Sequence, residues 1–199
     1  MTTQQQSPKW AENVILADAD HIDRVAFDLI VNFERMLGRR IQQADMARWA
    51  ECIALDGGLR EGDHQTNVIL IHEKDHAELR NFVPAHYASQ LTGQAFRSPL
   101  GEFVFNSVPT EAIAGKQQLM TDTLAFLMSQ PDVKRIMVVP DEQHYPQVRA
   151  TIQQADTADK HITVFAMQPM QGGAFAQEIL GYSLLSALGI KSDEIRPDA

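Results

Sequence analysis

The sequence contains a single cysteine, few basic residues and no long hydrophobic run. One cysteine, Cys52, in 199 residues excludes a disulfide framework and a cysteine-rich zinc finger. No apolar run approaches the ~20 residues that cross a membrane, and residues 1–10 lack the apolar stretch of a signal peptide. We therefore expect a cytoplasmic protein, in a reducing compartment, with no membrane partner.

Basic charge is scarce relative to acidic charge. Lys and Arg total 17 against 26 Asp and Glu, which gives a formal charge of −9. Non-specific nucleic-acid binding draws its energy from Lys and Arg on phosphates, so the balance disfavours RNA as a partner without excluding a local basic groove. The hydrophobic content of 44% is that of a globular protein and excludes general disorder.

The apolar residues form short runs separated by helical patterns. Four runs predict buried strands: residues 14–17, 68–71, 133–139 and 162–166. Strands joined by helices imply parallel crossovers. We predict an α/β fold, a three-layer sandwich around a mainly parallel sheet. Residues 1–12 are expected to form a flexible leader, 13–190 a single domain and 191–199 a polar tail.

Capping residues and apolar spacing predict where several helices begin and end. Gly38 is expected to end the first helix and Asp45 to begin the second. Asp75 and Glu78 resemble a capping box, which predicts a helix that Pro84 ends.

The second half of the chain carries further patterns. Residues 96–105 predict a short hairpin or an extended segment that ends in a strand. Residues 110–128 predict a helix or a broken pair of helices that includes Ile113, and residues 145–154 predict a helix. Apolar residues from Phe175 to Leu188 predict a late helix.

Acidic residues follow three of the predicted strands. Asp18 and Asp20 follow the first strand, Glu73 the second, and Asp141 and Glu142 a later one. Ligands bind beyond the carboxyl ends of the strands in an open parallel sheet, and clustered carboxylates bind Mg²⁺ or Mn²⁺. Such a metal can activate water and neutralise a transferring phosphate. The alternative is that these acids cap helices and shape loops.

Two segments resemble a known family. Residues 14–21, Val-Ile-Leu-Ala-Asp-Ala-Asp-His, resemble the opening strand of the PIN-like nucleases of the NYN branch, which ends in Asp-Gly-Asp/Glu-Asn. Residues 136–145 are similar to that family's strand ending in Ser-Gly-Asp-Ser-Asp-Phe. The resemblance implies a Rossmann-like sheet and RNA cleavage at a Mg²⁺ or Mn²⁺ site, with Asp18 and Asp141 as the catalytic acids. For such a site we expect Asp18 and Asp141 as the principal metal ligands, with Asp20, Asp122 or Glu142 assisting.

The chain departs from the family pattern at several positions. Ala19 replaces the glycine, His21 the asparagine, and His144 the last acid of the later motif. The family's Lys-x-x-Asp falls on Lys116 to Leu119, and Leu119 cannot bind a metal. Asp122 could substitute only if its helix shifted. The chain also resembles uncharacterised bacterial proteins grouped only as a domain of unknown function, which supplies no chemistry.

Residues 72–76, His-Glu-Lys-Asp-His, fit the HExxH zinc motif. That motif needs both imidazoles on one helix face. A strand runs directly into His72 and Asp75 is the expected N-cap, so His72 lies before the predicted helix and His76 inside it. We expect a chance match and no zinc.

The sequence is therefore compatible with three functions. The favoured hypothesis is a catalytically lapsed PIN/NYN-like module that binds a partner or forms a homo-oligomer. The second is a metal-dependent ribonuclease or phosphodiesterase, and the third is a zinc hydrolase using His72, Glu73 and His76. The sequence leaves open whether the protein is an enzyme.

Overall fold

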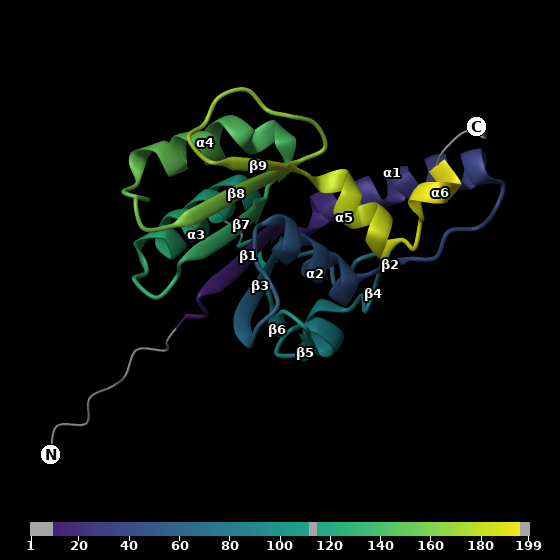
Figure 1. Ribbon diagram of the computed structural model, residues 1–199, viewed down its shortest axis with the longest axis horizontal. Helices are drawn as coiled ribbons and strands as arrows, with labels where there is room; N and C mark the ends of the chain where they lie inside the picture. The colour runs from purple at the N-terminus through teal and green to yellow at the C-terminus, as the bar shows by residue number, and fades with distance from the viewer. Residues whose placement is uncertain (1–9, 112–114, 196–199) are drawn as a thin grey trace, which may run out of the picture.

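A seven-stranded sheet runs through the middle of the molecule, with helices on both faces (Figure 1). The computed structural model describes residues 10–111 and 115–195. The strands of the sheet are β1 (Asn13–Asp18), β3 (His64–His72), β5 (Ala95–Ser98), β6 (Gly101–Pro109), β7 (Arg135–Val139), β8 (His161–Ala166) and β9 (Ala176–Ile179). The helices are α1 (Ala19–Leu37), α2 (Met46–Asp56), α3 (Lys116–Ser129), α4 (Tyr145–Gln154), α5 (Leu180–Ala187) and α6 (Ser192–Ile195).

The strand order is β5-β6-β3-β1-β7-β8-β9, and only β5 runs antiparallel to its neighbour. The central strand β1 therefore pairs with β3 on one side and β7 on the other, and the chain winds outward from it in both directions. The predicted α/β class and mostly parallel sheet are confirmed. A second, two-stranded sheet joins β2 (Ala44–Asp45) to β4 (Phe82–Val83).

The two faces of the sheet bury separate cores. Val14 and Leu16 of β1 pack with α3 and α4, whereas Ile15 and Ala17 pack with α1, α2 and α5. Successive residues of a strand point to opposite faces, so an unbroken apolar run is what a strand covered on both sides requires. All six residues of β1 are buried.

Several local predictions are confirmed. Gly38 ends α1 in the left-handed conformation (φ 64°), and Asp45 caps α2 by accepting a hydrogen bond from the Arg48 amide. The predicted helix over residues 145–154 is α4, and residues 95–109 form the β5–β6 hairpin. Helix α3 begins at Lys116, and the predicted helical residue Ile113 lies outside the described residues.

The helix predicted from Asp75 to Pro84 does not form. Residues 73–86 are turns and irregular backbone apart from the short strand β4 and one isolated bridge between Glu78 and His86, and the π-helical turn η1 (Tyr87–Leu91) follows. The amides that a helix needs are used elsewhere, because those of residues 80 and 81 donate to Asp23 on α1. The competing acceptor is distant in sequence, so local spacing gave the wrong result.

The predicted late helix is also only partly correct. Residues 176–179 form β9, which pairs in parallel with β8, and the helix begins only at Leu180. Pairing along the edge of β8 satisfies backbone groups that a helix would have satisfied internally.

The ends of the described chain contact the domain. Trp10 packs edge-on against Phe126 with ring centroids 5.8 Å apart, and the Ala11 amide donates to Asn67. Residues 1–9 of the predicted leader and 196–199 of the predicted tail lie outside the described residues. In the tail, Glu194 of α6 pairs with Arg39. None of the helices in residues 10–111 and 115–195 combines the length and apolarity needed to cross a membrane.

Candidate functional site

The carboxyl ends of three neighbouring strands bring the predicted acids to one edge of the sheet. Strand β1 ends at Asp18, β3 ends at His72, and Asp141 follows β7 by two residues. These strands lie side by side in the order β3-β1-β7, which places the point where the winding reverses at the candidate site. Asp18 caps α1, and Asp141 caps the short 3₁₀ turn η2 (Glu142–His144), so both acids also have the structural role weighed as the alternative.

Lys116 lies between the first two acids. Its Nζ is 3.1 Å from Asp18 Oδ1 and 2.9 Å from Asp20 Oδ2. Asp18 is only 2% exposed, so its charge has little access to water. Burial lowers the pKa of the Lys116 ammonium, but the neighbouring Asp18 and Asp20 carboxylates outweigh burial and leave that pKa raised. The two acids are therefore bridged by a cation that belongs to the chain.

Asp20 is the most connected acid of the site. Besides Lys116, it accepts a hydrogen bond from the Glu73 amide (2.9 Å), and His76 Nδ1 lies 2.5 Å from its Oδ1. Burial raises the pKa of Asp20, but the hydrogen bonds from His76, Lys116 and the Glu73 amide outweigh burial and lower it. Asp20 is thus an ionised group whose oxygens are already occupied.

Asp141 has a cationic partner of its own. Arg24 of α1 donates to Asp141 Oδ2 at 2.8 Å, and the Gln143 amide donates to Oδ1. Burial raises the pKa of Asp141, and these hydrogen bonds, with His21 nearby, lower it overall. His21 lies between the acids: its amide donates to Asp18, and its Nδ1 is 3.9 Å from Asp141 Oδ2.

The His21 ring is buried, and its Nε2 has no hydrogen-bond partner among residues 10–111 and 115–195. Burial lowers the pKa of His21, and the attraction of Asp141 and Asp18 only partly offsets burial. The ring is therefore a neutral imidazole enclosed by the charged groups of the site.

The remaining predicted ligands have hydrogen-bond partners outside this group. Asp122 is exposed on α3 and accepts a hydrogen bond from Gln118, and Glu142 accepts one from the Met167 amide. Within the described structure, neither is hydrogen-bonded or ion-paired to Asp18, Asp20 or Asp141. Over residues 10–111 and 115–195, no three His, Cys, Asp or Glu side chains are grouped so as to hold a metal ion.

The HExxH residues do not form the helix that the zinc motif requires. His72 ends β3, where its ring stacks on Tyr87 with centroids 3.7 Å apart. His76 follows in irregular backbone and is directed to Asp20. Glu73 accepts a hydrogen bond from Thr110. The two imidazoles therefore have separate partners and share no helix face.

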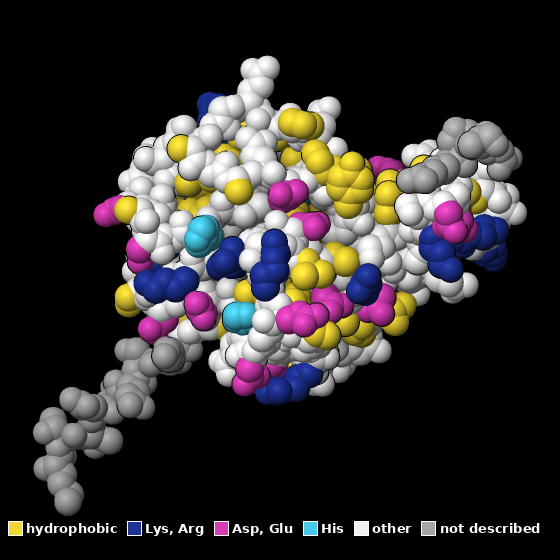
Figure 2. All heavy atoms as spheres, in the orientation of Figure 1, with side chains coloured by type: hydrophobic (Ala, Val, Ile, Leu, Met, Phe, Trp, Pro, Cys, Tyr) yellow, Lys and Arg dark blue, Asp and Glu magenta, His cyan; other side chains and the backbone are white. Residues whose placement is uncertain are grey.

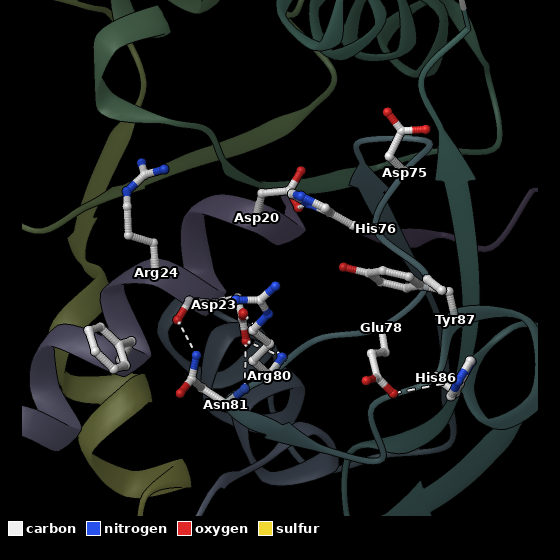
Figure 3. Close-up of a pocket in the computed structure, with 12 residues that line it drawn as sticks. Asp20, Asp23, Arg24, Asp75, His76, Glu78, Arg80, Asn81, His86 and Tyr87 are labelled. Atoms are coloured by element: carbon white, nitrogen blue, oxygen red, sulfur yellow. Dashed lines mark hydrogen bonds and ion pairs between the residues drawn. The ribbon is translucent and has the colours of Figure 1, made fainter.

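A cavity of about 740 Å³ opens beside Asp20. Its walls come from the first turns of α1 and from residues 75–87, the segment in which the helix was wrongly predicted. Figure 3 shows Asp20 and His76 directed toward one another at its rim, and Tyr87 entering from the opposite wall. The segment is held against α1 because Asp23 accepts hydrogen bonds from the amides of Arg80 and Asn81, at 2.8–3.1 Å.

Sequence reasoning missed most of this cavity. It identified Lys116 only as a family match and gave no role to Tyr87 or Arg80. A basic residue at the start of α3 gives no local signal of two acidic partners in β1 and α1. The role of residues 75 to 87 as a cavity wall was not predicted, because the pattern in this segment indicated a helix. Tertiary contacts override that pattern.

The sheet and its edge define the protein as an α/β protein with a polar candidate site at the carboxyl ends of a mostly parallel sheet. The chain belongs to a family of unknown function (DUF6621), whose sequence model matches residues 7–195. No curated protein and no solved structure matches the chain.

Proposed function

We propose that the protein is a ligand-binding module on a PIN/NYN-like scaffold whose ancestral metal position is filled by Lys116. Two features support the scaffold: a mostly parallel sheet that winds outward from β1, and acids that follow β1 and β7 as in the nuclease signatures. The cavity beside Asp20 provides the place for a ligand.

One observation carries the proposal. The Lys116 ammonium lies within 3.1 Å of both Asp18 and Asp20, where a shared divalent ion would need their oxygens. A divalent ion could bind here only if the Lys116 ammonium moved away from the two carboxylates. The ammonium would still lie close to the ion, and the two positive charges would repel one another. Arg24 forms an ion pair with Asp141, so this carboxylate also has a cationic partner within the chain. Cations of the chain itself therefore pair with the acids of the site.

Calorimetric titration with Mn²⁺ tests the proposal. Wild-type protein is expected to give no saturable heat, and Asp18→Asn to behave identically. Lys116→Met removes the ammonium and keeps most of the side-chain volume, so Mn²⁺ binding is expected to appear in that variant. Lys74→Met, an exposed lysine at the same edge, is the matched control and is expected to stay silent. Stoichiometric Mn²⁺ binding by wild type that Asp18→Asn abolishes would contradict the proposal.

A metal-dependent ribonuclease is the second candidate. It is favoured by the position of Asp18 and Asp141, which both contact His21 at one edge of the sheet. The charge of −9 counts against a polyanionic substrate, and on the face in Figure 2 Lys and Arg are interspersed with Asp and Glu. Cleavage of a labelled single-stranded RNA that requires Mn²⁺ and disappears in both Asp18→Asn and Asp141→Asn would establish this function instead.

A further inference from the structure

The cavity beside Asp20 has a wall that is almost entirely polar and aromatic. Four carboxylates and two guanidinium groups line it, together with histidine, asparagine, tyrosine and phenylalanine, and Ala77 is the one aliphatic residue among them. Such a wall offers hydrogen-bond donors and acceptors on facing sides (Figure 3). Its polar groups suit a small ligand that carries both hydrogen-bond donors and acceptors.

Tyr87 supplies a donor with no acceptor. The residue is 3% exposed, its ring is fixed by stacking on His72, and its hydroxyl points into the cavity (Figure 3). The hydroxyl makes no hydrogen bond with any residue in the described part of the chain. Burial, reinforced by the Asp20 and Asp23 carboxylates, raises the pKa of Tyr87, so the group stays a donor at neutral pH. The hydroxyl is thus a fixed donor at the cavity surface that is free to donate to a ligand oxygen.

Arg80 adds a second group without a protein partner. Its backbone amide donates to Asp23, but its guanidinium forms neither a hydrogen bond nor an ion pair with the described residues. Asp75, on the same wall, also has no partner there. Both unpaired side chains belong to a segment that Asp23 holds to α1, so the cavity is formed before any ligand arrives.

The charge of the wall restricts the ligand. Four carboxylates against two guanidinium groups make the cavity net negative, which repels a phosphate or carboxylate ligand. A ligand that uses the unpaired groups of the wall must nevertheless accept from Tyr87 and donate to the Asp75 carboxylate. A hydroxyl does both. Phe27, which lines the same cavity and is 53% exposed, offers an apolar surface to the C–H face of a ring.

We infer that the cavity binds a neutral polyhydroxylated ring, with one oxygen accepting from Tyr87 and a neighbouring hydroxyl donating to Asp75, the one lining carboxylate without a partner among the described residues. The chemistry is that of a sugar, either free or as the ribose of a nucleoside. The inference rests on the proposed function, because it takes the cavity rather than a metal site as the working part of the module.

Titration of the full-length protein tests the inference, with D-glucose, D-galactose, D-ribose and adenosine as probes. At least one neutral sugar or adenosine is expected to saturate the protein. Its phosphorylated counterpart, glucose 6-phosphate, galactose 6-phosphate, ribose 5-phosphate or AMP, is expected to bind about tenfold more weakly. Saturation by adenosine and not by free ribose would assign the ligand to nucleosides, and the reverse to free sugars.

The same substitution at two tyrosines provides the control. Tyr87→Phe removes only the hydroxyl and is expected to weaken binding about tenfold, whereas Tyr182→Phe, at a residue 70% exposed on α5, leaves it unchanged. The inference is overturned if no neutral probe saturates, if the phosphorylated form binds more tightly, or if Tyr87→Phe binds like wild type. If no sugar binds and wild type still shows no Mn²⁺ binding, only the inferred ligand class is overturned. Asp18-dependent Mn²⁺ binding overturns the proposed function.

Discussion

Asp23 shows how one side chain can organise a wall of the site. Its two oxygens accept the amides of Arg80 and Asn81, and its backbone carbonyl accepts from the Asn81 side chain. A segment rich in polar residues with little regular structure is thereby attached to α1. Such acceptors matter because backbone amides left without partners are costly.

Replacing Asp23 with alanine is expected to lower the free energy of unfolding by about 2 kcal/mol, because two amides lose their acceptor. Urea denaturation followed by circular dichroism measures the change. Asp28→Ala is the matched control, since Asp28 is exposed on the same helix and its side chain forms no hydrogen bond within the described structure. Equal losses in the two variants would show that the wall does not depend on Asp23.

A second prediction for a single residue concerns the contribution of Lys116 to stability. Removing its ammonium in Lys116→Met leaves Asp18 buried beside Asp20 without a cation. We expect a loss of about 3 kcal/mol of unfolding free energy at neutral pH, since removing one partner of a buried pair strands the other charge. Chemical denaturation at pH 7 measures it, with Lys74→Met as reference. Added Mn²⁺ is expected to restore part of the stability of Lys116→Met and none of that of Lys74→Met.

The β3–β6 ladder is the longest parallel pairing of the sheet and depends on a glycine. Gly101 begins β6 with φ of 108°, and a Cβ atom there would lie 2.1 Å from the backbone oxygen of His64. Gly93 also has positive φ (78°), but nothing lies within 4 Å of a Cβ at that position. Comparing the two glycines therefore distinguishes the cost of a positive φ, which both share, from the cost of a steric clash, which only Gly101 has.

Gly101→Ala is expected to destabilise the protein by about 3 kcal/mol or more, and Gly93→Ala by about 1 kcal/mol. Thermal denaturation of the two variants measures the difference. Similar losses would mean that the start of β6 can move away from β3 without cost.

Elements with strong local patterns were predictable, and elements decided by a distant partner were not. The apolar run of β1 and the bounds of α4 follow from residue spacing alone. Strand β9 has an unremarkable sequence, Ala-Gln-Glu-Ile, and exists because β8 offers it an edge. The segment after β3 does not form its predicted helix because its amides donate hydrogen bonds to Asp23 on α1.

Three groups of the site make the stability of the whole molecule depend on pH. The folded-state pKa values of His21, Asp20 and Asp141 are all lowered, so the folded chain binds fewer protons than the unfolded chain as the solution becomes acidic. Stability is therefore full above the unfolded values, about 6.5 for histidine and about 4 for aspartate, and falls below them.

We expect the free energy of unfolding to decline in two stages, first below about pH 6.5 and again below about pH 4. Urea denaturation between pH 8 and pH 3 measures the profile. His21→Gln is expected to remove part of the first stage while leaving the second in place. An unchanged profile in His21→Gln would show that other groups cause the first decline.

Local sequence was enough to place the central strands, the caps of α1 and α2, and the acids that follow β1 and β7. Hydrophobic periodicity and capping act over a few residues, and parallel strands align their carboxyl ends, so Asp18 and Asp141 had to share an edge. The tertiary structure alone decided what those acids meet. Lys116 reaches Asp20 across 96 residues of sequence, and the cavity forms from a segment that local pattern assigned to a helix. Partners so far apart are selected by the packing of the whole chain, which no short window of sequence contains.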